Sequence, residues 1–520
     1  MKGVCSTKKL LAMVGLVILT GCSKKQLEAD YLIINGQVYT AEQPHAEALD
    51  IAVCGSKICG VFLQGESNVI AKQTIDATDM IVSPGFIDPH THSLEELLSG
   101  DKNNNLNYLS QGVTTVVNGN DGEGPADIAG TVSKLQKNKI GTNVALLIGH
   151  GSVREQVMGR AQQHASAAQL DAMQKLVAKG MQEGALGLSS GLYYVPGSYA
   201  NTEEVVSLAK VVAEYQGIYD THMRDESTFN IGFLNAIKES IEIAEQAQVH
   251  LHLAHIKALG VDVWGQSEQA IELITQAQQR GVSISADQYP WLASGTKLHS
   301  AIMPKWVMAD SREAFIGRLN DAALANRLHA EINENIRRRG GPDSLLITAF
   351  QDANLVGKTL KEVAQASNQS AVDTAIELVK KGDVRVASFN MSQQDVNAFM
   401  QQPWVVTSSD GTNGHPRKYA SFPKKYQEYV VNKQLLTIAE FITQSSRKTA
   451  AYLGIKYRGV LKEGYAADII IWDANNFQAN ADFSQWNKLS TGVKYMLVNG
   501  HLVIDKYNYL NALQGKFIAR

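Results

Sequence analysis

Cysteine is scarce in this chain, and an excess of charge of one sign is missing. Only four of the 520 residues are cysteines, and two of these, Cys5 and Cys22, lie in the N-terminal leader. The other two, Cys54 and Cys59, are too few for a scaffold held together by disulfides. The formal net charge is −3, so the basic footprint of a nucleic-acid-binding protein is absent and no nucleic-acid partner is expected. The length suits a large domain with a smaller one beside it.

A long apolar run is also missing. Leu10–Leu19 is too short to span a bilayer comfortably. It ends in Leu-Thr-Gly-Cys22, which resembles a bacterial lipobox. The resemblance implies that residues 1–21 are a lipoprotein signal peptide and that Cys22 carries lipid, which anchors the mature protein to a membrane. Ser23 resembles an outer-membrane sorting signal, so the expected location is the bacterial cell envelope, on the outer membrane facing the periplasm. An ordinary secretory signal or an uncut anchor is the alternative.

Short strands and turns are expected near both ends of the chain. Asn-Gly pairs at 35–36 and 499–500 separate apolar runs and predict hairpin turns. We expect residues 22–83 and 458–520 to come together as one small β domain.

A further hairpin is predicted with its turn at Ser56-Lys57. In this register Cys54 faces Cys59 in a non-hydrogen-bonded pair, with Cα atoms about 4.5 Å apart. That separation allows a disulfide, and export from the cytoplasm favours oxidation. Two half-buried thiols are the alternative, and the sequence leaves the choice open.

The segment 81–93, IVSPGFIDPHTHS, is typical of a buried strand that ends in two histidines. His90 and His92 are two residues apart, so both side chains point to the same face of the strand. Imidazole is the commonest metal-ligand side chain. We therefore expect a metal site at the end of this strand.

Seven further strand-like runs follow, several of them separated by amphipathic helical stretches. This alternation indicates a parallel sheet, and eight such units predict an α/β fold of the (β/α)8 TIM-like barrel type over residues 84–457. A doubly wound sheet is the alternative. Residues from about 298 to 400 break the alternation, so we expect an insertion before the last strand, placed as a lid over the active face. The seven runs are 112–121, 143–151, 185–192, 217–224, 249–258, 282–291 and 404–411.

Six side chains with metal-binding or proton-transfer chemistry stand at the ends of these strands. Catalytic residues of a barrel lie at the C-terminal strand ends. Four histidines and two carboxylates on one rim predict a metal centre, and such nitrogen and oxygen ligands suit zinc, with other divalent ions as alternatives. The six are His90, His92, Asp121, His222, His255 and Asp410. His250 and His252, by contrast, are expected to pack outside the barrel.

Seven motifs resemble those of the amidohydrolase superfamily and, within it, the D-aminoacylase (N-acyl-D-amino-acid deacylase) family. In chain order they are PGFIDPHTHS, GVTTVVNGN, GALGLSSGLYY, THMRDE, AHIKALG, SSDG…HPR and RGVLKEGYAADIIIWD. The resemblance runs from about Tyr31 to about Val503. It implies a metal-dependent barrel, a small β-sandwich domain made by both ends of the chain, and hydrolysis of an N-acyl amide.

One position departs from the family's pattern. The family commonly has a cysteine ligand after the second strand, whereas this chain reads Gly119-Asn120-Asp121-Gly122. A carboxylate is a harder ligand than sulfur, so the metal's identity and the number of ions, one or two, stay open. Glu123 is the alternative ligand. The fourth strand has no lysine, which argues against the hydantoinase and dihydroorotase branch.

The resemblance also implies roles for the ligands. Asp121, His222 and His255 hold the tighter ion. His90 and His92 hold a weaker second ion or shape the site.

Further roles concern the reaction and the substrate. Asp410 is the expected general base. Lys257 and Tyr289 match positions that bind the substrate carboxylate. Arg224 and Arg417 are further candidates, and a structural ion pair is the alternative for each.

The sequence therefore predicts a metal-dependent hydrolase that splits the small-molecule substrate N-acyl-D-amino acid into a carboxylate and a free D-amino acid. An amidase or dipeptidase acting on peptides with D-residues is the alternative within the superfamily. A binding lipoprotein without catalysis is the alternative of a different class. Chirality, side-chain preference and oligomeric state are not decided at this level.

Overall fold

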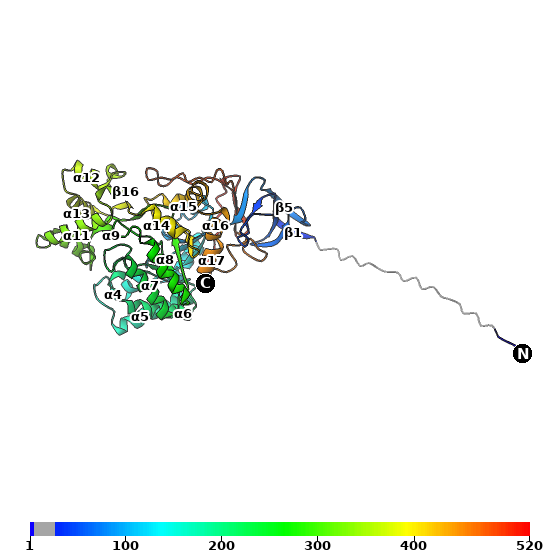
Figure 1. Cartoon of the computed structure of the whole chain (residues 1–520), viewed down its shortest axis with the longest axis horizontal. Helices are drawn as coiled ribbons and strands as arrows, with labels where there is room; N and C mark the ends of the chain where they lie inside the picture. The colour runs from blue at the N-terminus through cyan, green and yellow to red at the C-terminus, as the bar shows by residue number, and fades with distance from the viewer. Residues whose placement is uncertain (5–25) are drawn as a thin grey trace.

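The computed structural model of the protein describes residues 1–4 and 26–520. The predicted signal peptide, apart from its first four residues, and the predicted lipidation site at Cys22 lie outside the described residues. Within the described ranges, no helix is long and apolar enough to cross a membrane. Figure 1 shows the strands β1 and β5 at one end of the molecule and the helices α11 and α13 at the other, with the helices α5 to α8 between them.

The centre of the fold is a series of parallel strands that follow one another in chain order. Residues 143–149 supply two short strands of one extended segment, of which β9 pairs with β8 and β10 pairs with β11. Every ladder in the series is parallel, as intervening helices require. The strands are β7 (Phe86–Thr91), β8 (Val113–Asn118), β9 (Asn143–Leu146), β10 (Ile148–Gly149), β11 (Gly187–Gly191), β12 (Ile218–His222), β13 (His250–Leu253), β14 (Ile284–Gln288) and β18 (Val405–Thr407).

The last strand of this series returns to the first. Just after β18, the backbone N–H of Asp410 donates to the carbonyl oxygen of His90 over 2.9 Å, and Thr91 forms a parallel bridge with Gly411. The carboxyl ends of these strands therefore meet on one rim.

Helices follow most of these strands and cover them from outside. In α7 the buried residues Phe233, Ile237, Ile241 and Ala244 recur every three or four positions, which gives the helix one apolar face for the barrel. The helices are α1 (Leu94–Leu98), α2 (Leu106–Leu109), α3 (Ile128–Asn138), α4 (His150–Met158), α5 (Ala167–Gln182), η1 (Gly197–Tyr199), α6 (Thr202–Glu214), α7 (Phe233–Ala247), α8 (Ser267–Gln279), α14 (Gln393–Met400), α15 (Arg417–Lys425), η5 (Tyr426–Asn432), α16 (Ile438–Gln444) and α17 (Arg447–Tyr452).

Both ends of the chain supply strands to one sheet. Its order is β22-β21-β20-β19-β6-β2-β3-β1-β5, and β4 pairs with β3. Ile470 of β19 pairs with Ser83 of β6, which joins the two ends of the chain directly before β7 begins. The strands are β1 (Leu27–Ile34), β2 (Gln37–Val38), β3 (Glu47–Cys54), β4 (Lys57–Leu63), β5 (Val69–Asp76), β6 (Ile81–Pro84), β19 (Ile469–Trp472), β20 (Val493–Val498), β21 (His501–Asp505) and β22 (Asn508–Tyr509).

Two details of these terminal regions differ from the prediction. Asn35 makes the predicted turn at φ +62°, but β1 and β2 do not pair with each other, because both pair with β3. The last residues also leave the sheet, since Gly515 bridges to Ile140, just before β9, and Phe517 bridges to Val144 within β9. A local turn signal predicts the turn, whereas the tertiary fold selects the partner strand.

The insertion runs from Ala293 to Phe389, so both of its ends come earlier than the predicted 298 and 400. Its small sheet has the order β15-β17-β16, and it has a hydrophobic core of its own around Leu298 and Ile347. Helix α14 instead contacts α8 of the barrel. The elements are β15 (Ala293–Lys297), α9 (Leu298–Ile302), η2 (Lys305–Met308), α10 (Arg312–Asn320), α11 (Ala325–Arg338), η3 (Pro342–Ser344), β16 (Leu345–Ala349), η4 (Ala353–Leu355), α12 (Leu360–Ala366), α13 (Ala371–Lys381) and β17 (Arg385–Phe389).

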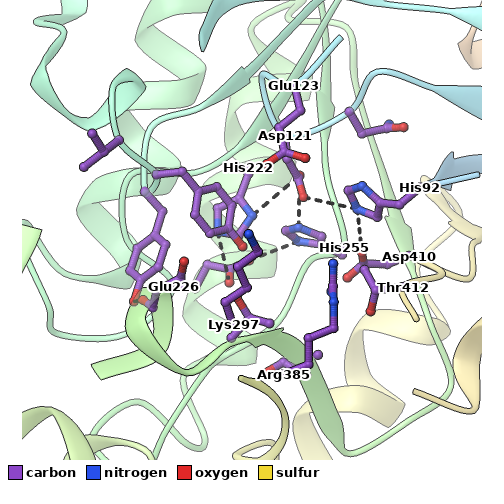
Figure 2. Close-up of a pocket in the computed structure, with 18 of the residues that line it drawn as sticks. His92, Asp121, Glu123, His222, Glu226, His255, Lys297, Arg385, Asp410 and Thr412 are labelled. Atoms are coloured by element: carbon purple, nitrogen blue, oxygen red, sulfur yellow. Dashed lines mark hydrogen bonds and ion pairs between the residues drawn. The ribbon is translucent and has the colours of Figure 1, made fainter. Parts of the chain in front are cut away.

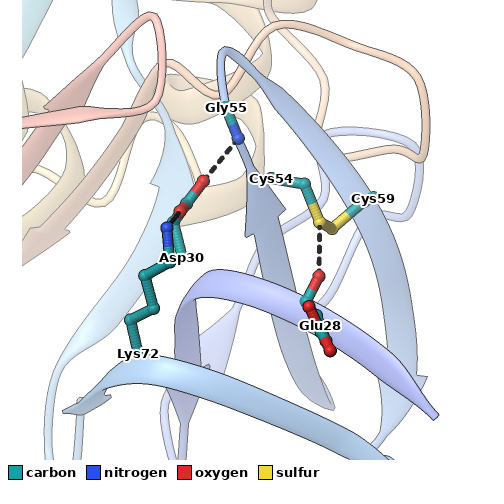
Figure 3. The surroundings of a disulfide bond; sticks show 6 residues. All are labelled: Glu28, Asp30, Cys54, Gly55, Cys59 and Lys72. Carbon is teal, nitrogen blue, oxygen red and sulfur yellow. Dashed lines mark hydrogen bonds and ion pairs between the residues drawn. A yellow bond between two sulfur atoms is a disulfide. The ribbon is translucent and has the colours of Figure 1, made fainter.

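Cys54 and Cys59 form a disulfide in the hairpin of β3 and β4, with Cα atoms 5.7 Å apart (Figure 3). The predicted register is wrong, because the turn is Gly55-Ser56 and Cys54 pairs with Lys57. Gly55 adopts φ +55°, a conformation that costs glycine little. An irregularity between Ala52 and Val53 leaves Cys59 as an extra residue on the opposite strand, and this bulge brings its side chain to Cys54.

Candidate metal centre

The six predicted strand-end residues meet on the rim, and Figure 2 shows all of them except His90. All are buried except His92, whose side chain is 22% exposed. Their possible ligand atoms form two overlapping groups in which all atoms lie within 4.8 Å of one another. The first group is His90, His92, Asp121 and Asp410, and the second is Asp121, His222 and His255.

Asp121 belongs to both groups. Its Oδ1 atom lies 3.3 Å from His255 Nε2, 3.5 Å from His222 Nδ1 and 3.5 Å from His90 Nε2. Its Oδ2 atom lies 3.5 Å from His92 Nε2. Asp121 thus stands where a ligand shared by two ions would stand. The alternative, Glu123, is exposed on the wall of the cavity and belongs to neither group.

Sharp backbone turns follow three of the strands and aim these side chains at the rim. Asp121, His255 and Asp410 have φ values of +58°, +35° and +47°. Residues other than glycine rarely adopt this region, and such strain concentrates at functional sites.

Several buried atoms of the cluster lack a hydrogen-bond partner among the described residues. They are both ring nitrogens of His90, Nδ1 of His222 and Oδ1 of Asp121. Leaving a buried polar atom unpaired costs about 1–3 kcal/mol. A divalent cation between these atoms would satisfy them, so the residues present fit the predicted metal centre.

Glu226 holds the two histidines of the second group from behind, and the sequence prediction missed it. Its oxygens lie 3.2 Å from His255 Nδ1 and 3.6 Å from His222 Nε2, the ring nitrogens that do not face Asp121. Burial would raise its pKa, but Lys257 and the two histidines lower the pKa of Glu226 to about 2. Its position four residues after His222 in THMRDE was the available signal.

Asp287 supports His90 in the same way and was also missed. Its Oδ2 atom lies 3.6 Å from His90 Nδ1 and 3.1 Å from His252 Nε2. The prediction that His252 packs outside the barrel is wrong. Its ring is 1% exposed and points toward Asp287 and Ser285, which satisfy both of its nitrogens. Carboxylates behind ligating histidines orient the rings and raise their basicity.

Asp410 faces the first group with one oxygen and an arginine with the other. Oδ1 lies 3.2 Å from His92 Nε2, and Oδ2 lies 2.7 Å from Nη1 of Arg417. Burial would raise its pKa, but Arg417 and His90 outweigh burial and lower the pKa of Asp410 well below its usual range. Arg417 thereby fixes which oxygen of Asp410 faces the cluster.

The residues predicted to bind the substrate carboxylate occupy different settings. Lys257 lines the cavity, but its Nζ already lies 2.7 Å from Glu226. The buried hydroxyl of Tyr289 has no partner in the described residues, and the ring lies 4.7 Å from the Arg417 guanidinium. Arg224 does not reach the cavity, because three of its contacts hold Glu239 at 2.8 to 3.0 Å. Arg224 is therefore part of a structural ion pair and not a candidate for substrate binding.

A cavity of about 450 Å³ opens over the cluster. The barrel supplies one wall, and the insertion supplies the other, from which Lys297 and Arg385 point toward the cluster (Figure 2). Tyr193 and Tyr194 close one side, where the ring of Tyr194 lies 4.6 Å from that of His222. The enclosure suits a small molecule that reaches the cluster through this opening.

Comparison with known proteins gives consistent matches over nearly the whole chain. The D-aminoacylase of Alcaligenes xylosoxydans xylosoxydans is 27% identical over 519 residues, which covers 94% of this chain and 98% of the relative. The crystal structure of N-acyl-D-glutamate deacylase from Bordetella bronchiseptica, complexed with zinc and a phosphonate inhibitor, is 25% identical, with a TM-score of 0.81 and coverage of 95% of this chain and 100% of the other. A D-aminoacylase structure described for its binuclear metal center is 26% identical, with the same TM-score and coverage.

The model of the amidohydrolase family matches residues 73–504, a range that contains the whole cluster and its supporting carboxylates. The chain belongs to the amidohydrolase family.

Proposed function

We propose that this protein hydrolyses the N-acyl amide bond of N-acyl-D-amino acids. The observation that carries the proposal is the placement of a buried carboxylate, Asp410, 3.2 Å from His92 on the rim of a metal-fitting cluster that opens into a cavity. The names of the relatives support the substrate class, because a D-aminoacylase and an N-acyl-D-glutamate deacylase both match over nearly the whole chain.

The cluster is proposed to hold zinc, as one ion or two. Asp121, His222 and His255 would hold one ion, and Asp121 with His90 and His92 would hold the other. The nitrogen and oxygen donors suit zinc, and a relative crystallised with zinc supports that choice. When bound, such an ion supplies Lewis-acid polarisation of the amide carbonyl and lowers the pKa of water toward ~7.

The protein's own residues move the proton. Asp410 accepts a proton from the attacking water through Oδ1, the oxygen that faces the cluster. The new bond forms between the water oxygen and the acyl carbon, the C–N bond breaks, and Asp410 returns the proton to the leaving amine nitrogen. Arg417 keeps Oδ2 turned away from the substrate throughout.

The test compares N-acetyl-D-amino acids with their L-enantiomers, using protein whose zinc content has been measured. We expect release of free amine from the D-substrates only. Asp410→Asn should keep its metal and lower kcat by about 10²- to 10⁴-fold, because it removes proton transfer but not the ligand set. Lys175→Met, a change on the exposed face of α5, is the control and should retain wild-type kcat.

Two results would contradict the proposal. Release of amino acids from dipeptides with D-residues, with acetylated substrates untouched, would favour the dipeptidase alternative. Binding of an N-acyl-D-amino acid by metal-loaded protein without any turnover would favour a binding protein.

We infer further that the protein is exported and lipid-anchored, facing the periplasm from the outer membrane. The lipobox-like residues before Cys22 support this, and a disulfide in the body suits an oxidising compartment. Cells expressing Cys22→Ser should release the protein from the membrane fraction and lose incorporation of labelled palmitate. Unchanged fractionation and labelling would exclude the anchor.

A further inference from the structure

Two cations of the insertion meet at one tyrosine in the wall of the cavity. Nζ of Lys305, in η2, lies 3.5 Å from the centre of the Tyr193 ring. Arg339, which follows α11, directs Nη2 to the Tyr193 hydroxyl over 3.4 Å. All three residues line the cavity.

Neither cation has a carboxylate within 4.0 Å among the described residues. Arg339 is 2% exposed and donates to neutral groups, the carbonyl oxygen of Ala301 at 2.9 Å and the Ser388 hydroxyl at 3.4 Å. Within the described part of the chain, Nζ of Lys305 contacts the Tyr193 ring and the carbonyl oxygen of Ser300, the latter at 3.5 Å. A buried arginine stays charged, and a buried charge without a counter-ion is costly.

Two other lysines of the cavity are paired with carboxylates, whereas Arg385, which also lines the cavity from the insertion, has no carboxylate within 4.0 Å among the described residues. Lys257 is paired with Glu226 and Lys297 with Asp383, each at 2.7 Å. Asp225, the acid that stabilises the charge of Lys305 from a distance, already accepts three backbone N–H groups.

The remaining carboxylates do not change this balance. Glu95 and Glu123 also line the cavity, but they are exposed and belong to the barrel wall, after β7 and β8. Glu96, on the same wall as Glu95, is paired with Lys418. Burial, followed by the charge of Arg339, lowers the pKa of Lys305. The surplus positive charge therefore lies on the insertion wall, and Lys305 and Arg339 bring two of its three cations to Tyr193.

Tyr193 connects the two cations at its ring to the candidate metal centre. The Tyr193 ring stacks on His222, with ring centres 5.6 Å apart. Phe229 packs edge-on against Tyr193 at 5.8 Å and also lies under the Arg339 guanidinium at 5.4 Å. Both rings line the cavity, so they offer an apolar surface for one or two methylene groups beside the two cations.

We propose that Lys305 and Arg339 bind the side-chain carboxylate of the substrate, so that the enzyme prefers N-acyl derivatives of acidic D-amino acids. The inference rests on the proposed function and adds its side-chain specificity. The acyl carbonyl would lie at the cluster, the methylene groups would lie against Tyr193 and Phe229, and the carboxylate would supply the missing counter-ion. Pairing a desolvated cation with an anion gives discrimination against a neutral side chain of the same shape.

The test compares N-acetyl-D-glutamate with N-acetyl-D-glutamine, which has the same shape without the charge. The wild type should show a kcat/KM at least about 30-fold higher for the glutamate derivative. Lys305→Gln should remove most of this ratio by lowering kcat/KM for the glutamate derivative alone, and Lys305→Arg should restore it. Lys424→Gln is the matched control, since Lys424 is half-buried over the Trp291 ring but does not line the cavity.

The outcomes separate this inference from the function on which it rests. Equal or better hydrolysis of the glutamine derivative by the wild type would overturn the subsite and leave the deacylase activity standing. A Lys305→Gln variant that melts like the wild type and keeps the ratio would also overturn it. If metal-loaded wild type hydrolyses no N-acyl-D-amino acid, the proposed function fails and the subsite fails with it. The ratio of the two kcat/KM values, measured on the wild type alone, tests the proposed subsite even where a variant does not fold.

Discussion

Oδ1 of Asp121 lies 3.3 Å from Nε2 of His255, which is the shortest of its four contacts with the imidazole cluster. The same carboxylate reaches His92 through its other oxygen. A single residue thus connects the two halves of the candidate metal centre, at the position where a thiolate is common in the family that the sequence resembles.

Asp121→Ala should lower zinc affinity by more than about 100-fold, because it removes a donor from both groups of ligands, an effect larger than that of a supporting residue. Asp121→Cys should retain zinc and shift selectivity from manganese toward zinc, because sulfur is the softer donor. Equilibrium dialysis with elemental analysis measures both effects. If Asp121→Ala binds zinc like the wild type, Asp121 is not a ligand.

Glu226→Gln should weaken zinc binding by about 10- to 100-fold without abolishing it, because Glu226 orients His222 and His255 and contributes charge to their rings. The variant also leaves Lys257 without its partner. The control is Glu204→Gln, which removes a buried carboxylate paired with His150 and Arg154, away from the cluster. If both variants lose zinc equally, the loss reflects general destabilisation and not support of the ligands.

Lys425 should make the free energy of unfolding depend on pH. It is fully buried, its Nζ donates to Thr407 and Gln444, and burial lowers its pKa from 10.5 to about 7. Below pH 7 the Lys425 amine is protonated in both the folded and the unfolded chain, and the folded chain bears a buried charge. Above pH 7 the folded state releases the proton while the unfolded chain keeps it, so stability rises by about 1.4 kcal/mol per pH unit.

Lys425→Met removes this titration. The stability difference between the variant and the wild type should be constant below pH 7 and should shift in favour of the wild type from pH 7 to 9. Urea denaturation at several pH values measures it, with the exposed Lys175→Met as control. If the free energy of unfolding depends on pH in the same way for the wild type and Lys425→Met, Lys425 does not titrate in this range.

Replacing both Cys54 and Cys59 by serine should lower the free energy of unfolding by roughly 2 kcal/mol, the amount expected for a short closed loop. The kcat should not change, because the hairpin lies in the terminal sheet at the end of the molecule away from the insertion and its cavity wall (Figure 1). Denaturation with and without reductant measures the loss. Reduced wild type should match the double variant, and a difference between them would point to a defect from the serines themselves.

Much of the fold could be predicted because its signals are local. Apolar strands that alternate with amphipathic helices require parallel pairing, and parallel pairing brings strand ends to one rim. His90, His92, His222 and His255 could be placed on that rim by their position after apolar runs. The strand that pairs with β1 and β2, on either side of the Asn35 turn, could not be predicted, because a turn signal does not indicate which sheet edge is free for pairing.

The supporting carboxylates escaped prediction for a related reason. Glu226 and Asp287 have no motif of their own, and their role exists only once His222 and His90 have turned one ring nitrogen toward them. Lys257 was predicted to bind the substrate carboxylate, and Arg417 either to bind it or to form a structural ion pair; in the folded chain each meets a carboxylate of the protein.

The sequence by itself determined the kinds of ligand and their order along the chain, since strand and helix periodicity act over a few residues. Only the tertiary structure decided that His92 meets Asp410 across 318 positions and that Asp121 belongs to both ligand groups. It also decided that Lys305 and Arg339 have no carboxylate counter-ion among the residues that the structure describes. Closure of the strand ring and packing of the insertion set these distances, and charge pairing depends on distance in space rather than in sequence.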